Sequence, residues 1–424
     1  MTDSVQSFPP PTASYEADPE HVHRVLLLYS GGLDTSVMLK WIQDQYNAEV
    51  VCLTVNLGQP GEDYEAVEGK ARMLGALECH VVDAREEFAR DYVVPAIKAN
   101  ALYGGGYPLF TALGRPLIAK LAVDYARGSG CDTIAHGCTG KGNDQVRIEA
   151  TVATLAPELK VIAPVRSWEM GREEEIAYAR EHGIPIKGSH PTGTEVAPYS
   201  IDDNLWGRSS EGRWIEELDH APEDDVFQLV TRPELAPDEP ETVQVEFERG
   251  VPVGLNGERM GLVDLLERVA EIAARHGVGI VDHIEDRIVG LKVRDIYEAP
   301  AAAILLPAHQ ELEKLVCTIH QNQFKAGLDR QWAYLVYAGL WWEPLRTDLD
   351  AYMDSVNAHV TGTIGLKLYK GHARVVTRSS AGAVYDQALA SFGESGGLFS
   401  QTASPGFIEL WSLQSRMAWR LRNS

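Results

Sequence analysis

Arg24-Val-Leu-Leu-Leu-Tyr-Ser-Gly-Gly-Leu-Asp-Thr-Ser-Val37 is the stretch of sequence that decides the fold. Residues 24–29 form a short, mostly apolar run that stops at Ser30-Gly31-Gly32, which predicts a buried strand. Residues 34–45 then place apolar side chains at helical spacing. A glycine turn between a strand and a helix lets the backbone approach an anion and directs N–H groups toward it. The stretch therefore predicts an anion-binding loop at the edge of a sheet.

The alternation of strand and helix continues along the chain. It predicts strands at 49–55, 80–83, 132–136 and 161–165, and helices at 63–75, 86–100, 116–127 and 172–182. Strands separated by helices of this length are typical of a parallel sheet that is covered on both faces. The fold class is therefore α/β for the first domain, which we expect to span residues 23–188.

The pattern changes after this domain. We expect a loop at 188–197, an exposed connection at 219–241, strands at 242–249, 282–292 and 361–376, and helices at 262–276, 298–322, 329–343 and 408–422. This order predicts an α+β domain at 189–385 and a C-terminal helical arm at 386–424. Residues 1–22 are rich in Pro, Ser and acidic residues, which predicts a disordered leader.

Composition narrows the class of protein. The chain has 424 residues, of which 45% are hydrophobic, and this excludes wholesale disorder. The net charge of −23 argues against a nucleic-acid partner, because phosphate backbones are bound by basic surfaces. The five cysteines show neither a CxxC pair nor a metal-ligand spacing, which is typical of reduced thiols in the cytoplasm. Neither a membrane span nor a signal peptide is expected.

The first candidate site is the glycine turn itself. Ser30, Thr35 and Ser36 add hydroxyl groups to it, and the lysine of a Walker A loop is missing. Asp34 is out of place in a pure anion site, but it would suit a Mg²⁺ ion that bridges the protein to phosphates. The alternative is an ordinary tight turn. The segment resembles the PP-loop of ATP pyrophosphatases, which cleave ATP between its α and β phosphates.

A second polar loop follows the strand predicted at 132–136. It reads His136-Gly-Cys-Thr-Gly-Lys-Gly-Asn-Asp-Gln-Val-Arg147 and by itself could be a solvated turn. Two such loops at the carboxyl ends of strands in one parallel sheet would face the same crevice. Together they predict a binding site between them.

At this level of detail the chain resembles the argininosuccinate synthase family. The resemblance extends from about residue 24 to near the C-terminus, and the segment GKGNDQVR is its most discriminating part. The matching segments are LLLYSGGLDTSV (26–37), VNLGQ (55–59), ALYGGGYPL (101–109), AHGCTGKGNDQVR (135–147), YSIDDNLWGR (199–208), EDRIVGLKVRDIYEAP (285–300) and QFKAGLDRQWAYLVYAGLW (323–341).

The resemblance implies an ATP-dependent ligase that joins citrulline and aspartate and releases AMP and pyrophosphate. It also implies a cytoplasmic homotetramer with an arm that reaches across subunits, and a citrullyl-adenylate intermediate. The implied ATP-binding positions are Leu28, Tyr29, Ser30, Gly31, Gly32, Leu33, Asp34, Thr35, Ser36, Val55 and Gly137. The implied aspartate positions are Thr139, Asn143 and Asp144, and the citrulline positions are Tyr107, Asn143, Arg147, Ser200, Ser209, Glu285 and Tyr297.

The residue types suit these roles. Glu285 can pair with the α-ammonium group of citrulline, and Arg147 can bind its carboxylate with two parallel N–H groups. Asp144 can pair with the ammonium group of aspartate. Asp34 is expected to hold Mg²⁺ beside ATP, and Lys141 is the candidate for neutralising phosphate charge. The chemistry would depend on positioning and charge neutralisation, without a covalent nucleophile.

Four positions depart from the family pattern. The stretch 187–198 is longer than expected and precedes two citrulline positions. Ala112 stands where a serine is common, with Thr111 beside it. Cys138 lies inside the second loop, where it is either a redox-sensitive thiol or a small buried residue. Asp295 stands where a small or uncharged residue is expected.

Three alternative functions are less consistent with the sequence. A tRNA-thiolating enzyme would need to bind RNA and generally uses a catalytic cysteine, which the charge and the cysteine pattern disfavour. A glutamine-hydrolysing amidation enzyme would need a cysteine that the N-terminus MTDSVQ lacks. A non-catalytic nucleotide sensor would not need the citrulline and aspartate positions.

Overall fold

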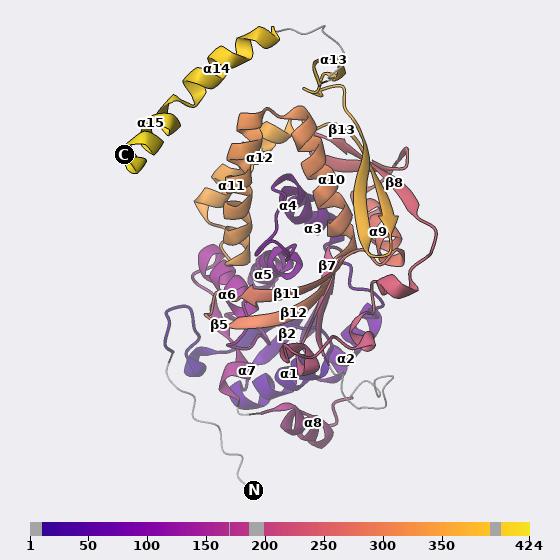
Figure 1. Cartoon of the computed structure of the whole chain (residues 1–424). Coiled ribbons are helices and arrows are strands. Elements are labelled where there is room, and N and C mark those ends of the chain that lie inside the picture. The colour runs from indigo at the N-terminus through magenta and orange to yellow at the C-terminus, as the bar shows by residue number, and fades with distance from the viewer. Residues whose placement is uncertain (1–10, 169, 186–198, 391–399) are drawn as a thin grey trace.

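The computed structural model describes residues 11–168, 170–185, 199–390 and 400–424. Figure 1 shows its arrangement. The strands are β1 Arg24–Leu28, β2 Glu49–Asn56, β3 Glu78–Asp83, β4 Thr133–Ala135, β5 Lys160–Ile162, β6 Ser200–Asn204, β7 Gly207–Glu211, β8 Glu241–Glu248, β9 Val251–Leu255, β10 Glu258–Arg259, β11 Ile280–Asp286, β12 Lys292–Glu298, β13 Gly362–Tyr369 and β14 His372–Ser379. The helices are α1 Leu33–Tyr46, α2 Tyr64–Met73, α3 Arg85–Phe88, α4 Val94–Lys98, α5 Phe110–Gly128, α6 Asp144–Leu155, α7 Pro164–Ser167, α8 Arg172–Glu181, α9 Leu262–Arg275, α10 Pro300–Val316, α11 Ile319–Tyr337, α12 Pro344–Asn357, α13 Gln387–Ala390, α14 Ser404–Trp411 and α15 Leu413–Asn423.

The first sheet is parallel, as the sequence predicts, with strand order β3-β2-β1-β4-β5. Side chains of its strands alternate between two cores. Leu26 and Leu53 belong to the core that includes α5 and α6, whereas Val25 and Cys52 belong to the core that includes α1, α2 and α8. Helices therefore cover both faces of the sheet, which explains why the buried strands are apolar almost throughout.

Strand order reverses beside β1. The chain runs outward from β1 to β2 and β3, and then returns to the other side of β1 for β4 and β5. Ligands of open α/β sheets bind at such a switch point, outside the carboxyl ends of the strands. The two predicted loops follow β1 and β4, which are hydrogen-bonded neighbours. The topology therefore brings them to one crevice.

The second half contains two antiparallel sheets and a group of helices. One sheet has the order β10-β9-β8-β13-β14, and the other has the order β11-β12-β7-β6. Val245 and Ile364 of the first of these sheets share one core with Trp332 of α11 and with Leu26 of the parallel sheet. A continuous core therefore joins the two halves, and in Figure 1 β11 and β12 lie between the parallel sheet and the helices α10–α12.

Several elements differ from the sequence prediction. Helix α6 was not predicted, so Asp144 and Arg147 lie on its first turn and not in a loop. The expected helix 298–322 ends at Val316, because Thr318 and Gln321 form a capping box that starts α11. The predicted strand regions 282–292 and 361–376 are hairpins, and the hairpin β6–β7 was not predicted.

Two helix boundaries also differ. Helix α5 begins at Phe110, so Pro116 lies inside it and not at its start. The expected aromatic helix 329–343 is the second half of α11, which ends at Tyr337. The loop expected at 188–197 lies outside the described residues.

The leader prediction is wrong for residues 11–22. The backbone of Glu16 bridges Val161, and Ala17 donates an N–H hydrogen bond to the carbonyl of Val161 (3.0 Å). Ala17 and Val22 are buried in the core around α1. This segment therefore lies along β5. Residues 1–10 lie outside the described residues.

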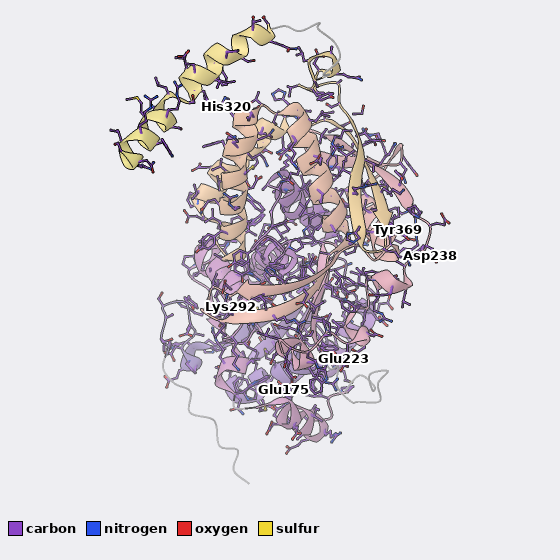
Figure 2. The ribbon with its side chains drawn as sticks, in the orientation of Figure 1. Glu175, Glu223, Asp238, Lys292, His320 and Tyr369 are labelled. Carbon is purple, nitrogen blue, oxygen red and sulfur yellow. The ribbon has the colours of Figure 1, made fainter. Side chains whose placement is uncertain are left out.

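Helices α14 and α15 are exposed along almost their whole length. Figure 1 shows α14 and α15 standing away from the body, and Figure 2 shows side chains spreading from both sides of these helices. Leu410, Trp411 and Leu421 each expose at least three quarters of their surface. Among the residues that the structure describes, no helix combines the length and apolar character of a membrane span.

Candidate active site

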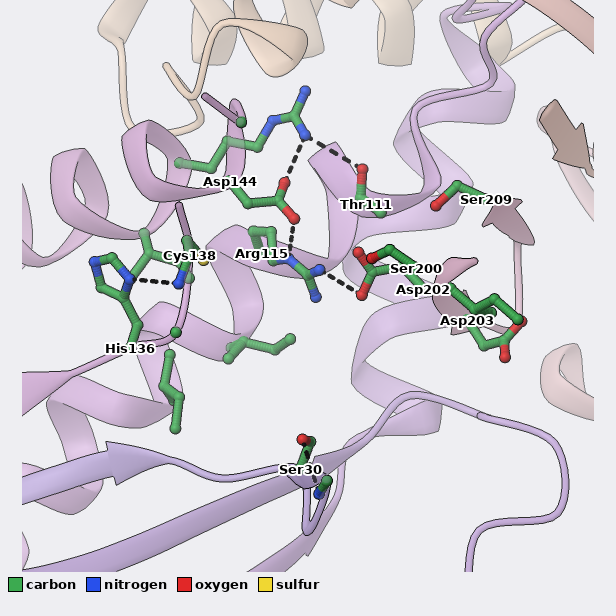
Figure 3. Close-up of a pocket in the computed structure, with 18 of the residues that line it drawn as sticks. Ser30, Thr111, Arg115, His136, Cys138, Asp144, Ser200, Asp202, Asp203 and Ser209 are labelled. Atoms are coloured by element: carbon green, nitrogen blue, oxygen red, sulfur yellow. Dashed lines mark hydrogen bonds and ion pairs between the residues drawn. The ribbon is translucent and has the colours of Figure 1, made fainter. Parts of the chain in front are cut away.

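A cavity of about 670 Å³ opens at the switch point of the parallel sheet. One wall is the loop after β1 and the start of α1, and a second is the loop after β4 and the start of α6. The hairpins β6–β7 and β11–β12 of the other half close it. Figure 3 shows Ser30 on one side of this space and Asp144 and Arg115 on the opposite side.

The loop after β1 is held in shape by its own hydroxyl groups. The Ser30 and Thr35 hydroxyls are hydrogen-bonded (3.1 Å), and Ser36 donates to the carbonyl of Gly32 (2.6 Å). Gly31 has a φ of +74°, and a Cβ there would lie 2.9 Å from Val67 Cγ2. Helix α1 has no side-chain cap, so the N–H groups of its first turn are available to a ligand. The geometry suits a phosphate chain.

The loop after β4 is held in place by hydrogen bonds of the buried His136 side chain. Its Nδ1 accepts the backbone N–H of Cys138 (3.2 Å), so its Nε2 carries the proton toward Glu149 (2.9 Å). Burial would raise the pKa of Glu149, but its contacts with His136 and Arg166 lower it. His136 therefore has a structural role. Burial also raises the pKa of the Cys138 thiol well above its usual range, which disfavours a reactive thiolate.

A network of ion pairs surrounds Asp144 at the start of α6. The Asp144 carboxylate accepts Arg115 Nε at 2.7 Å and Arg147 Nη1 at 2.8 Å, as Figure 3 shows for Arg115. Burial would raise the pKa of Asp144, but the two guanidinium groups hold it at about 2. Arg115 also donates to Asp202 (2.6 Å) on β6. The Asp144 carboxylate therefore stays ionised throughout the neutral range.

Arg147 is more fully engaged than the sequence suggested. Its Nε and Nη2 both donate to the carbonyl of Tyr337 (3.1 and 3.0 Å), while Nη1 donates to Asp144 and to Thr111 (3.2 Å). Four of the five N–H groups of the guanidinium are thus in use. The bidentate bond to a substrate carboxylate that we expected from the sequence does not fit this arrangement, and one N–H remains.

Glu285 lies in an aromatic enclosure at the far end of the cavity. It accepts hydrogen bonds from the hydroxyls of Tyr337 (2.6 Å) and Tyr297, and it is 4% exposed. Tyr107 stacks on Tyr297 with ring centroids 4.6 Å apart. Asn143 donates to the Tyr337 hydroxyl (2.8 Å) and accepts the N–H of Ile288 (3.0 Å). The enclosure fixes a carboxylate that can receive a cationic group.

Comparisons with known proteins agree with this geometry. Residues 24–185 match the family model "Arginosuccinate synthase N-terminal HUP domain", and residues 199–418 match "Arginosuccinate synthase C-terminal domain". The chain belongs to the argininosuccinate synthase family. It is 55% identical to the argininosuccinate synthase of Rubrobacter xylanophilus over 93% of this chain and 94% of the relative. For the Pyrococcus furiosus argininosuccinate synthase the identity is 49%, over 94% and 95%.

Most positions implied by the resemblance to argininosuccinate synthase line the one cavity. All the aspartate and citrulline positions do so, as do Val55 and Gly137. Three do not. Gly31 and Ser36 support the loop from behind, and Lys141 is exposed and lies outside the lining. The Lys141 role in phosphate binding therefore stays a prediction without support from the geometry.

Several lining residues were not predicted from the sequence. Arg115, Arg287 and Asp202 sit in elements whose contact with the site depends on tertiary structure. Thr111 was named only as a neighbour of Ala112. Its hydroxyl is hydrogen-bonded to that of Tyr107 (2.5 Å) and lines the cavity, while Ala112 is fully buried. A hydroxyl group therefore lines the cavity one residue before the position where the argininosuccinate synthase pattern has a serine.

Proposed function

We propose that this cavity condenses L-citrulline with L-aspartate at the expense of ATP and yields argininosuccinate, AMP and pyrophosphate. This activity belongs to arginine biosynthesis and makes the protein an AMP-forming carbon–nitrogen ligase. One observation carries the assignment to this cavity: the glycine loop after β1 and the tyrosine-held Glu285 line the same space. An anion at one end and an amino acid at the other can therefore meet inside it.

ATP occupies the end formed by the parallel sheet. Its phosphates lie against Ser30, Gly32 and the first turn of α1, where N–H and hydroxyl donors converge. The adenosine lies toward Val55 and Gly137, which line the cavity on either side of β1. A Cβ at position 137 would lie only 3.1 Å from the buried Met38 Cε, so a larger residue would require Met38 to move.

Citrulline occupies the end formed by the hairpins. Its α-ammonium group pairs with Glu285. The carboxylate can still accept hydrogen bonds from this group, because the two tyrosine hydroxyls use only part of its acceptor capacity. Its carboxylate takes the remaining N–H of Arg147 and the hydroxyls of Ser200 and Ser209, which face the cavity from β6 and β7. This assignment replaces the bidentate Arg147 contact with a set of single hydrogen bonds.

Aspartate lies between the two, beside the start of α6. Asp144 is ionised and can receive its ammonium group, and Thr139 and Asn143 line the same part of the cavity. The ureido oxygen of citrulline attacks the α-phosphorus of ATP, and pyrophosphate leaves. The aspartate amine then attacks the activated ureido carbon, and AMP leaves. Positioning of the reactants supplies most of the rate enhancement in such transfers.

Mg²⁺ would accompany ATP at Asp34. The described part of the chain contains no group of three or more His, Cys, Asp or Glu placed to hold a metal ion. A single carboxylate fits Mg²⁺, because this ion usually binds substrate phosphates and water and only one or two carboxylates. When bound, Mg²⁺ would neutralise phosphate charge, and Asp34 would orient the loaded nucleotide from the first turn of α1.

The substitution Asp34→Asn tests this role. We expect pyrophosphate release to fall by about 100-fold, because the metal supplies several kcal/mol of charge stabilisation. Asp44→Asn, on the same helix but outside the cavity, is the control and should leave the rate unchanged. A near-native rate with an unaltered Mg²⁺ dependence in Asp34→Asn would remove Asp34 from the metal site.

The activity itself has a direct assay. Pyrophosphate release should require citrulline, ATP and Mg²⁺, and argininosuccinate should form only when aspartate is added. Release that is equal with unrelated amino acids would contradict the assignment.

We also propose a homotetramer in the cytoplasm, with residues 386–424 as the oligomerisation arm beyond an ATP-binding unit (23–188) and a synthetase unit (189–385). The support is the apolar surface of α14 and α15, where Phe407, Trp411 and Trp419 are each more than 60% exposed. Such a surface is covered in most stable proteins. A monomeric mass in light scattering at micromolar concentration would contradict this proposal.

A further inference from the structure

We propose that Asp295 is a specificity-determining residue of the cavity, a second carboxylate beside Glu285 that receives the α-ammonium group of the amino-acid substrate. This inference rests on the proposed function, which places that ammonium group at Glu285. It concerns a position where the resemblance to the family predicted a small or uncharged side chain and offered no role.

The placement of Asp295 makes it part of the site. It lies on β12, directly opposite His283 of β11, and its side chain is 7% exposed. Alternate residues of a strand share a face, so Asp295 points to the same side as Tyr297. Both residues, and Glu285, line the cavity.

The hydrogen bonds around Asp295 are incomplete. Among the described residues, Oδ1 is buried and accepts no hydrogen bond, and the nearest cation is Arg287 Nη2 at 3.6 Å. Oδ2 lies 3.2 Å from the Tyr297 hydroxyl, but that hydroxyl has one proton and makes its shorter bond with Glu285. A buried carboxylate oxygen without a hydrogen bond is costly, and one in a native structure calls for an explanation such as a bound ligand.

The charges that face Asp295 favour an incoming cation. Glu211 approaches from β7 and Glu285 from β11, and Arg287 is the opposing guanidinium in the turn between β11 and β12. His283 faces it from the paired strand. Arg147 also acts on Glu285, so three carboxyl groups stand against two guanidinium groups, and this end of the cavity is negative when Asp295 is ionised. An ammonium group with three N–H donors could use both Glu285 and the free Oδ1.

These surroundings also set the protonation of Asp295. Burial raises its pKa to about 7, with a further contribution from Glu211 and an opposing one from Arg287. Below that pH the empty site holds a neutral carboxyl group, and a bound ammonium group favours its ionisation. Binding of citrulline near pH 6 should therefore release a proton, and the affinity should improve as the pH rises through 7.

The test is the citrulline dependence of pyrophosphate release by Asp295→Asn. At pH 8 we expect the KM for citrulline to rise about tenfold, with kcat and the KM for ATP within twofold, because one charged contact is lost in a buried site. Between pH 8 and pH 6 the wild-type KM should rise up to about tenfold, while that of the variant stays flat, so that the two curves converge. Asp286→Asn, an exposed carboxylate in the same hairpin, is the matched control and should behave as wild type.

Protein stability separates this role from a purely structural one. A raised folded-state pKa means that ionised Asp295 opposes folding above pH 7 and has no such effect below the pKa of an unfolded aspartate. Asp295→Asn should therefore melt at a higher temperature at pH 8 and fold normally. If Asp295→Asn melted at a higher temperature but kept the wild-type KM and pH profile, the inference about Asp295 would be wrong, while the proposed function would still stand. Wild-type protein that released no pyrophosphate with citrulline would overturn the proposed function as well.

Discussion

The two ends of the cavity are built by different means. At the nucleotide end the ligand would meet mainly backbone N–H groups and small hydroxyls, all from residues 30–36 and the first turn of α1. At the amino-acid end it would meet carboxylates whose positions depend on tyrosines from three separate elements. A contiguous segment suffices for the phosphates, although the adenosine would also meet Val55 and Gly137, whereas the amino-acid end exists only when distant segments pack together.

This difference has an energetic counterpart. Glycine loops offer many weak donors, so no single one is decisive. A buried carboxylate in an aromatic enclosure has a large desolvation cost, and its charge acts strongly on a ligand in the same low-dielectric space. Side-chain substitutions should therefore cost more at the amino-acid end.

The largest effect is expected for Glu285→Gln. The substitution removes the buried charge and leaves one of the two tyrosine hydroxyls facing an amide N–H₂. We expect kcat/KM for citrulline to fall by about 10²–10³-fold, as for truncation of a buried charge pair. Affinity for ATP, measured by calorimetry, should stay within twofold. An equal loss of ATP affinity would mean that the two ends are not separable.

A moderate effect is expected for Gly31→Ala at the other end. The φ of +74° disfavours any residue with a Cβ, and the new methyl group would meet Val67 at 2.9 Å. ATP affinity should fall by about tenfold, since strain of this kind costs about 1–2 kcal/mol.

The double variant Gly31→Ala/Val67→Ala separates two causes of the lost ATP affinity, the steric contact with Val67 and the backbone strain at residue 31. Removing the two methyl groups of Val67 should restore the part of the affinity that the contact cost. No recovery at all would show that backbone strain alone is responsible. Citrulline KM should not change in either variant.

The smallest effect is expected for Thr111→Val. This substitution deletes the hydroxyl shared by Tyr107 and Arg147 and keeps the shape of the side chain. We expect citrulline KM to rise by about threefold to tenfold, the value of one hydrogen bond. Ala112→Ser is the paired test: it restores the family's hydroxyl at a fully buried position and should give no gain. An improved KM in Ala112→Ser would show that the serine position still reaches the substrate.

The same contrast explains what the sequence could predict. Ser30, Asp34 and Thr35 lie in a short segment between a strand and a helix, and local pattern is enough to place them. The parallel sheet follows from the alternation of elements, whereas the strand order that creates the switch point was seen only in the structure. At the amino-acid end, Glu285 and Tyr297 were found only through the resemblance to the family.

The elements that were not predicted have physical reasons as well. Helix α6 begins inside a glycine-rich stretch, and its buried face includes Arg147 and Glu149, so its apolar period is weak. Arg115 reaches the site because α5 begins at Phe110, before Pro116, against the preference of proline for a first turn. The start of α11 has a local signal, the capping box of Thr318 and Gln321, which also separates it from α10. The free Oδ1 of Asp295 could not be foreseen from any local pattern.

The bonds between Arg147 and the carbonyl of Tyr337 join residues 190 positions apart, and those from Asn143 to Tyr337 span 194. During synthesis the glycine loop leaves the ribosome long before α11 does. A nascent or truncated chain that lacks α11 would hold Glu285, Asn143 and Arg147 without the partners that orient them. The amino-acid end of the cavity is therefore complete only after residue 337 has been added to the chain.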